Sequence, residues 1–249
     1  MLTSPGSVST LARRIASSIR SRAPIARTFF DTNAAAIADA AREVAARLNS
    51  GGRIYAFGRG AYATDAQHVA VEFVHPVLVG KPALPASDLS LSFESSLPVM
   101  LAGHDVVVGF GPPQGDESVT RALAQARRLG AFAIGFPGDA ADFSAVPATD
   151  DEHVHQEIVE ITGHILYESV HVFLEHRKRD DDVGASAFLY PFLGGDRKTE
   201  ESLAREVALS VRQKAADAEA LRERARDALV ALRWAKSDDD VLGRDHDRE

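Results

Sequence analysis

Residues 51–75 read GGRIYAFGRGAYATDAQHVAVEFVH, and this stretch decides the fold class. The apolar run 53–57 predicts a short buried strand, and the Gly-Arg-Gly sequence at 58–60 predicts a tight turn. A helix is expected from Tyr62 to His75, because Pro76 cannot continue it. The order strand, glycine turn, helix is typical of a βαβ unit, which belongs to a mainly parallel sheet.

The same alternation continues along the chain. Strands are predicted at 83–90, 105–110 and 132–136, and helices at 34–48, 117–129 and 153–177. Right-handed crossovers turn this order into a three-layer α/β/α sandwich. Ligands of such sheets bind beyond the carboxyl ends of the strands. We therefore expect one crevice lined by residues 58–63, 88–96 and 111–118.

The two ends of the chain differ from this central part. Residues 1–30 are rich in Arg and Ser and contain no acid, which resembles a transit peptide but agrees better with a basic helix near 11–22. Apolar residues at three- and four-residue steps predict a long amphipathic helix at 199–232, packed on the domain or on another subunit. Its expected apolar face consists of Leu203, Val207, Val211, Ala218, Leu221, Ala225 and Leu229. The expected divisions are an arm at 1–30, an α/β domain at 31–180, a helical extension at 181–236 and a solvated acidic tail at 237–249.

Composition excludes several classes of protein. The chain has 249 residues and a net charge of −8, so a general binder of nucleic acid is not expected. It contains no cysteine, which leaves His, carboxylate, amide or water as ligands for any metal. No apolar run approaches the roughly 18 residues of a membrane helix. We therefore expect a cytoplasmic protein without membrane or nucleic-acid partners.

Two features of the sequence can carry chemistry. Residues 58–63 fit the loose dinucleotide fingerprint G-x-G-x-x-A, but no acid follows at the usual distance, so no nucleotide cofactor is expected. The helix after this turn carries His68, Glu72 and His75, and the helix at 153–177 repeats the spacing with His164, Glu168 and His171. Imidazole with carboxylate suits Zn²⁺ or another divalent metal, or a general acid–base pair. Any one of these histidines can equally be a structural residue.

Residues 51–60 and the run Asp-Ala-Gln-His-x-x-x-Glu at 65–72 resemble the sugar-isomerase (SIS) domain of phosphoheptose isomerases. Gln156-Glu157 followed by Gly163-His164-Ile165-Leu166 resembles the same family, and the resemblance extends over about residues 30–177. It implies an α/β/α sandwich that assembles into homodimers or homotetramers with active sites between subunits. It also implies proton transfer between C1 and C2 of sedoheptulose 7-phosphate.

The resemblance assigns roles to individual residues. The zinc positions correspond to His68, Glu72, Gln156 and His164, and the proton-transfer positions to Glu72 and His164. The expected substrate-binding residues are Gly58, Arg59, Gly60, Asp88 and Ser118.

The phosphate-binding loops depart from the family pattern. Arg59 replaces an Asn of the first loop, and Gly-Pro-Pro-Gln-Gly-Asp-Glu-Ser at 111–118 replaces a Ser-rich second loop. Proline removes backbone donors, and Asp116 and Glu117 repel a phosphate unless they are paired. Two hypotheses follow: an isomerase acting on a sugar phosphate at a divalent metal, or a non-catalytic SIS module that acts through oligomerisation and a protein partner bound by the C-terminal helix.

Overall fold

The computed structural model describes residues 5–76, 81–178 and 199–242. Its centre is a five-stranded sheet in the order β2-β1-β3-β4-β5, in which every pair of neighbours is parallel. The strands are β1 (Ile54–Gly58), β2 (Ala86–Asp88), β3 (Val106–Phe110), β4 (Phe132–Phe136) and β5 (Phe143–Ser144). The predicted parallel sheet is confirmed, and β5 is a short edge strand that the sequence did not predict.

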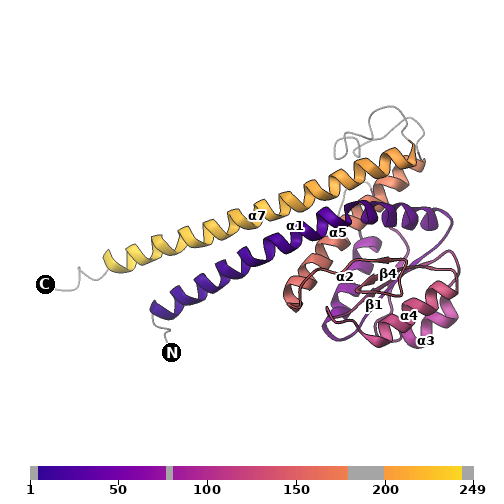
Figure 1. Cartoon of the computed structure of the whole chain (residues 1–249), viewed down its shortest axis with the longest axis horizontal. Coiled ribbons are helices and arrows are strands. Elements are labelled where there is room, and N and C mark those ends of the chain that lie inside the picture. Colours follow the sequence, from indigo (N-terminus) through magenta and orange to yellow (C-terminus); the bar gives the residue numbers. More distant parts are fainter. Residues whose placement is uncertain (1–4, 77–80, 179–198, 243–249) are drawn as a thin grey trace.

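Helices cover both faces of this sheet, as Figure 1 shows. The helices are α1 (Pro5–Asn49), the short 3-10 turn η1 (Gly60–Tyr62), α2 (Ala63–Val74), α3 (Phe93–Met100), α4 (Glu117–Arg128), α5 (Glu152–Lys178) and α7 (Glu200–Leu242). Alternate strand residues point to opposite faces. Ile54 and Val106 accordingly pack with α1, α2 and α5, whereas Tyr55 and Val107 pack with α3 and α4. The predicted three-layer α/β/α sandwich is confirmed.

The register of the two central strands places the crevice. Gly58 at the end of β1 pairs with Phe110 at the end of β3, so the loops that follow both strands leave from the same edge. The strand order reverses between β1 and β3, which is where ligands of such sheets bind. A side chain at Gly58 would meet the Tyr62 carbonyl oxygen at 2.3 Å, so only glycine allows η1 to fold back this closely.

The N-terminal region differs from the prediction. The helices expected at 11–22 and 34–48 are parts of one helix, α1. Asn33 is a residue type that favours the N-cap of a helix, but within α1 it donates from Nδ2 to the Phe29 carbonyl oxygen at 2.8 Å. Phe29 and Phe30 are buried in the core, and this burial holds the backbone helical across the predicted break.

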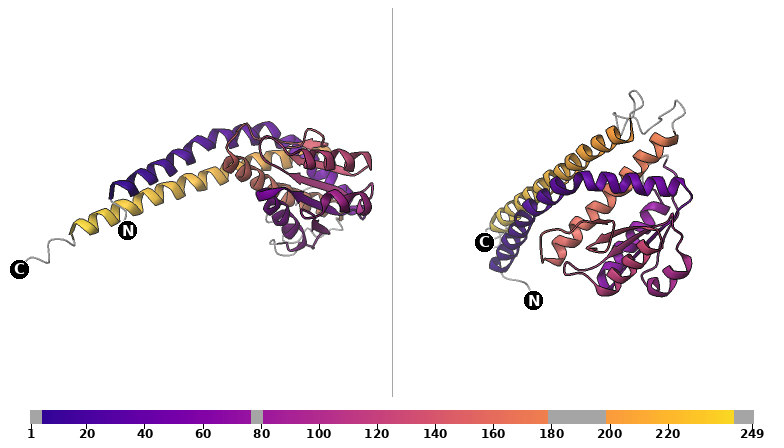
Figure 2. Two further views of the ribbon diagram at one scale, coloured as in Figure 1. Left: turned by 90° about the horizontal axis from the view of Figure 1, so that it is seen from below. Right: turned by 45° about the vertical axis from the view of Figure 1, so that its right-hand side comes forward.

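The C-terminal helix α7 lies antiparallel to α1, and the two helices project together from the α/β domain (Figures 1 and 2). Leu203, Val207 and Val211 are buried in the core, as predicted. Leu221 and Ala225 are exposed in the single chain, so this part of the expected face does not pack on the domain, and the side chain of Leu229 lies outside those described. Burial along α7 instead continues at four-residue steps from Val211 to Glu219. At Glu219 the buried residue is therefore polar and no longer apolar. The helix also ends at Leu242, ten residues beyond the expected 232, within the stretch expected to be a solvated tail.

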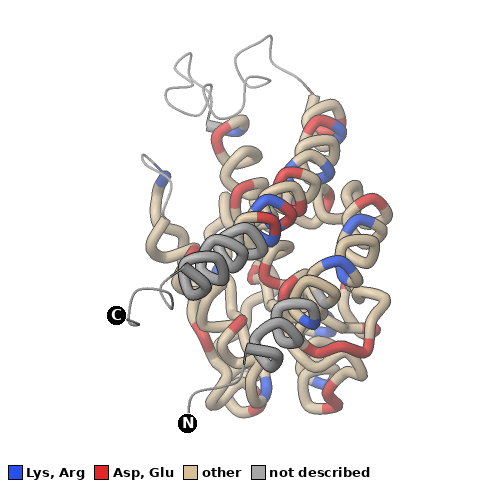
Figure 3. Tube along the Cα trace, turned by 90° about the vertical axis from the view of Figure 1, so that its left-hand side faces the viewer, with Lys and Arg blue, Asp and Glu red and all other residues tan. Residues whose placement is uncertain are grey.

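One carboxylate joins these two helices to α5. Glu157 accepts from Arg22 of α1 at 2.8 Å and from Arg222 of α7 at 2.5 Å, and all three side chains are about three-quarters buried. We call this group the Glu157 triad. Elsewhere along α7 acidic and basic residues alternate (Figure 3), which is typical of a solvated helix face.

Two smaller findings complete the fold. The sequence assigned no element to residues 91–102, where the structure forms α3 despite Pro98 within the helix. Among the residues that the structure describes, no helix is long and apolar enough to cross a bilayer.

Candidate active site

Two facing helices bring six polar side chains together. Asp65, His68 and Glu72 recur along α2 at the spacing of one helix face, and Gln156, Glu160 and His164 do the same along α5. They meet in three pairs, which we call the α2–α5 ladder. Gln156 Nε2 donates to Asp65 Oδ1 at 2.9 Å, His68 Nδ1 lies 2.7 Å from Glu160 Oε2, and His164 Nδ1 lies 2.7 Å from Glu72 Oε1.

The ladder has a buried side and an open side. Asp65 and Glu72 are buried at 1% and 7% exposure. The side chains of His68 and His164 are nearly half exposed, and their ring centroids lie 4.9 Å apart. Two imidazoles are thus accessible from solvent, each backed by a carboxylate.

The ladder shifts the pKa values of two of its members. The hydrogen bond to Glu72, opposed by burial, raises the pKa of His164, so its imidazolium form extends to higher pH. Burial and the neighbouring Glu160 raise the pKa of Asp65 to about 7, although the Gln156 amide acts in the opposite direction. Perturbed titratable groups gathered at one place are typical of functional sites.

The residue types and spacing at the ladder fit a divalent metal. Single ligand atoms of His68, Glu160 and His164 all lie within 4.8 Å of one another. Imidazole nitrogen and carboxylate oxygen bind Zn²⁺ at about 2.0–2.2 Å, so three atoms this close together can surround one ion. A hollow of about 10 Å³ lies beside them, closed by Phe110 at the end of β3. Its size matches roughly one water molecule, which suits an ion.

All four predicted metal residues lie on the ladder. His68 and His164 lie in the cluster, and Glu72 reaches it through its contact with His164. Gln156 donates from its amide nitrogen to Asp65, a contact that does not use the amide oxygen through which a glutamine would bind a metal. The sequence analysis missed Asp65 and Glu160. Both lie at helical spacing from the predicted residues, so a search of the two helix faces for further acids could have found them.

The second predicted His-x-x-x-Glu run does not extend the ladder past His164. Glu168 forms an ion pair with Lys214 of α7. His171 is buried, with its ring centroid 4.7 Å from that of Tyr167. For these two residues a structural role is the one that their surroundings indicate.

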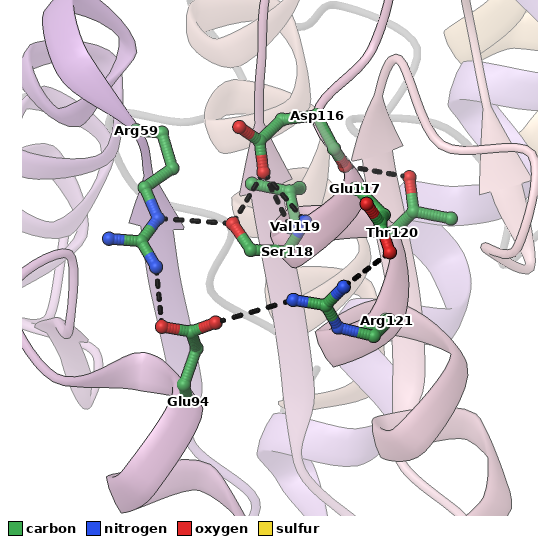
Figure 4. A network of polar contacts seen from close by, with 8 residues as sticks. All are labelled: Arg59, Glu94, Asp116, Glu117, Ser118, Val119, Thr120 and Arg121. Carbon is green, nitrogen blue, oxygen red and sulfur yellow. Dashed lines mark hydrogen bonds and ion pairs between the residues drawn. The ribbon is translucent and has the colours of Figure 1, made fainter.

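A second polar cluster occupies the crevice beyond β1 and β3 (Figure 4). Arg59 Nε donates to Ser118 Oγ at 3.0 Å, and the same guanidinium forms an ion pair with Glu94 of α3. The carboxylate of Asp116 accepts from the backbone N–H groups of Ser118 and Val119 at 2.8 and 3.0 Å. Arg59 and Ser118, both expected to bind substrate, are thus brought together by the fold.

The other expected substrate residues support the end of β1. Asp88 accepts from the Ser90 hydroxyl at 2.5 Å, and that hydroxyl accepts from the Gly58 N–H at 3.1 Å. Gly60 has a φ of +60°, which favours glycine at this turn. The side chain of Asp88 is therefore engaged with its own loop.

One buried histidine that the sequence analysis left without a role holds the β3–α4 loop. His155 is fully buried at the start of α5, and its Nε2 lies 3.1 Å from the Gly111 carbonyl oxygen. Burial lowers the pKa of His155, although its contacts with the backbone carbonyls of Gly111 and Phe136 oppose this effect, so its neutral form is favoured. The helix that carries half of the ladder is therefore bonded to the crevice loop.

Comparisons with known proteins agree with this arrangement. The SIS domain family matches residues 19–98. A phosphoheptose isomerase of Desulfovibrio desulfuricans is 31% identical over 205 residues, which cover 73% of this chain and 94% of that protein. The chain belongs to the phosphoheptose isomerase family. A second family member, from Solidesulfovibrio magneticus, is 31% identical over 185 residues and 90% of its length.

Solved structures support the fold of this family member. The phosphoheptose isomerase from Francisella tularensis superposes with a TM-score of 0.56 at 18% identity, covering 67% of this chain and 98% of the other. The enzyme from Neisseria gonorrhoeae gives 0.53 at 19% identity, covering 64% and 98%. In both cases the compared protein is matched over nearly its whole length, whereas about a third of this chain lies outside the match.

Proposed function

We propose that the chain is an aldose–ketose isomerase that acts on a sugar phosphate, with Glu72 and His164 as its proton-transfer pair. The observation that carries the proposal is their contact at 2.7 Å on the two facing helices of a phosphoheptose isomerase family member. A buried carboxylate beside a half-exposed imidazole provides a base and an acid within reach of one substrate carbon–oxygen unit.

The two residues have complementary tasks. Glu72 takes the proton from the carbon next to the carbonyl, and the same carboxylate returns it to the neighbouring carbon. His164 supplies a proton to the carbonyl oxygen as negative charge develops there, and removes the proton from the hydroxyl that becomes the new carbonyl. The raised pKa of His164 supports this role, since more of the imidazole carries a proton near neutral pH.

A divalent metal fits this proposal. His68 and Glu160 would hold it, and His164, which lies in the same cluster beside Glu72, would serve as a ligand only in the state in which it does not carry the transferred proton. When bound, such an ion supplies electrostatic stabilisation of an enediolate. Further expectations belong to the proposal: that the metal is zinc, that the chain forms homodimers or homotetramers with sites between subunits, and that it works in the cytoplasm. The half-exposed ladder supports an interface site, because a second subunit can close its open side.

Sedoheptulose 7-phosphate is the first substrate to test, because the relatives that match over most of their length are named phosphoheptose isomerases. Conversion is followed by NMR in D₂O, which also detects solvent deuterium entering at the reacting carbon. We expect Glu72→Gln and His164→Ala to lower kcat by about 10²–10⁴-fold. His75→Ala, on an exposed residue one turn beyond Glu72, is the matched control and keeps activity.

The competing hypothesis is a non-catalytic SIS module. The converged acid–base pair and the family membership support the isomerase instead. Absence of turnover and of deuterium incorporation in the wild-type protein, both as purified and with added Zn²⁺, would contradict the isomerase. An equal loss in His75→Ala would contradict the assignment to Glu72 and His164.

A further inference from the structure

Two arginines in the crevice share one carboxylate. Glu94, in the first turn of α3, forms an ion pair with Arg59 through one oxygen, and its other oxygen lies 3.7 Å from Arg121 of α4 (Figure 4). Arg59 comes from the turn after β1 and Arg121 from α4, which follows β3, and the two cations converge on a single anion at the switch point between these strands. Glu94 therefore occupies a position at which both arginines favour negative charge.

The backbone donors of this crevice are already engaged. The Asp116 carboxylate accepts from the first free N–H groups of α4, where an anion would otherwise bind. Burial acts to raise the pKa of Asp116, but the hydrogen bonds from Ser118 and Val119 outweigh it, so the pKa is lowered and the carboxylate stays charged. Pro112 and Pro113, in the same loop, have no N–H to offer. At the start of α4, an incoming anion therefore depends on side chains for most of its contacts.

Arg59 is held ready for that task. Its Nε is fixed by Ser118 Oγ at 3.0 Å, and its guanidinium carbon lies 4.9 Å from the centre of the Phe93 ring. These contacts orient the guanidinium whether or not Glu94 is present. Arg121 is oriented by Glu117 of its own helix at 2.6 Å, which leaves the rest of its guanidinium turned toward Glu94.

The Glu94 carboxylate can be displaced from the two arginines at little cost. Its side chain is 52% exposed, and those of Arg59 and Arg121 are 44% and 61% exposed. Ion pairs this exposed contribute little to stability, so rotating the carboxylate into water costs little. A phosphate dianion offers more charge and more acceptor oxygens to two guanidiniums than one carboxylate does. If Glu94 stayed in place, the three acids and two arginines of this cluster would instead repel a dianion.

We propose that Arg59 and Arg121 bind the phosphate end of the substrate, and that Glu94 is an internal competitor that the phosphate displaces. This inference rests on the proposed function for the nature of the substrate. It makes Arg121 and Glu94 specificity-determining residues. An unphosphorylated sugar leaves the Glu94 ion pairs intact, so the crevice selects against it.

Calorimetric titration of inorganic phosphate into the full-length protein tests this proposal without any need for turnover. We expect Arg59→Gln and Arg121→Gln each to weaken phosphate binding about tenfold, since each removes charge-assisted hydrogen bonds. Glu94→Gln keeps the shape of the side chain but removes its charge, and we expect it to tighten binding about three- to tenfold. Arg128→Gln, on an exposed arginine at the other end of α4, is the matched control with unchanged affinity.

The direction of the Glu94 effect is decisive. Unchanged or weaker phosphate binding in Glu94→Gln would overturn the displacement, because a purely structural Glu94 gives that result. Equal losses in Arg128→Gln and Arg121→Gln would mean that phosphate responds only to overall charge. Melting temperatures of all four variants show that the folded protein is being compared.

The test separates this inference from the proposed function. Phosphate should bind Glu72→Gln with wild-type affinity, because Glu72 belongs to the ladder and not to the arginine cluster. A protein that fails to isomerise any sugar phosphate but shows the expected phosphate affinities retains the anion subsite. A protein that isomerises sedoheptulose 7-phosphate with no dependence on Arg59, Arg121 or Glu94 retains the function and loses the subsite.

Discussion

Gln156 and Glu160 lie one turn apart on α5 and face different partners. The amide of Gln156 is bound to Asp65, whereas the carboxylate of Glu160 approaches His68 and belongs to the cluster that fits a metal. The resemblance of the sequence to its family favours Gln156 as a ligand, and the geometry favours Glu160. The two residues can be tested separately.

Removal of Glu160 should abolish metal binding, and removal of Gln156 should not. We expect Glu160→Gln to lose at least tenfold in zinc affinity, since a charged ligand is replaced by a neutral amide. Gln156→Ala should retain stoichiometric zinc by elemental analysis of protein purified without a chelator or an affinity tag. The reverse result, with zinc lost from Gln156→Ala alone, would show that the ligands rearrange on binding.

Asp65 should make stability depend on pH. Because its pKa is raised to about 7, the folded protein binds a proton there that the unfolded chain releases near pH 4. The stability contributed by the neutral carboxyl is complete below about pH 4 and is lost as the pH rises through about 7. In metal-free protein, Asp65→Asn should therefore melt a few degrees above wild type at pH 8 and close to wild type at pH 4. An equal difference at both pH values would contradict this explanation.

At the scale of single elements, α4 shows how a helix start can be closed to ligands. Asp116 precedes the helix in an extended conformation, and its side chain caps the first turn. The sequence analysis identified Asp116 as a charge hostile to phosphate. In the structure it also occupies the helix N-terminus itself. Asp116 thus stabilises α4 and occupies two backbone donors, those of Ser118 and Val119, that an anion could otherwise use.

Loss of this cap should be measurable. Asp116→Ala should reduce the free energy of unfolding by about 1 kcal/mol, the usual cost of removing an N-cap carboxylate. Urea denaturation followed by circular dichroism provides the measurement. Glu117→Gln, one residue later with an 88% exposed side chain, is the control and should stay within about 0.5 kcal/mol of wild type. A cap variant as stable as this control would be contrary to expectation.

The sequence was most informative where one local rule decides the structure. The apolar run at 54–58 and the glycine turn after it predicted β1 and its crevice, because a parallel strand is buried on both faces. Local rules failed where tertiary contacts decide. Asn33 is a good cap in isolation, yet the burial of Phe29 and Phe30 keeps α1 continuous. Likewise, Glu160 becomes a candidate site residue only in the folded chain, where α2 places His68 opposite it.

At the scale of the whole molecule, the Glu157 triad connects the projecting helices α1 and α7 to α5 of the α/β domain. Glu157→Gln removes the shared charge and leaves Arg22 and Arg222 largely buried without it. We expect a loss of about 1–3 kcal/mol in the free energy of unfolding, measured by urea denaturation. The matched control is Asp39→Asn, whose pair with Arg42 is exposed and should contribute less than about 1 kcal/mol. Equal effects of the two variants would show that the triad is no stronger than a surface pair.

The Glu157 triad connects α1 and α7 to the helix that also carries half of the ladder. Glu157 follows Gln156 directly and precedes Glu160 by less than one turn, so the triad lies beside the ladder on α5. A displacement of α1 or α7 relative to α5 would have to break or carry with it the contacts of Arg22 and Arg222 with Glu157. A rotation of α5 then changes all three contacts with α2 together, as well as the grip of His155 on the crevice loop.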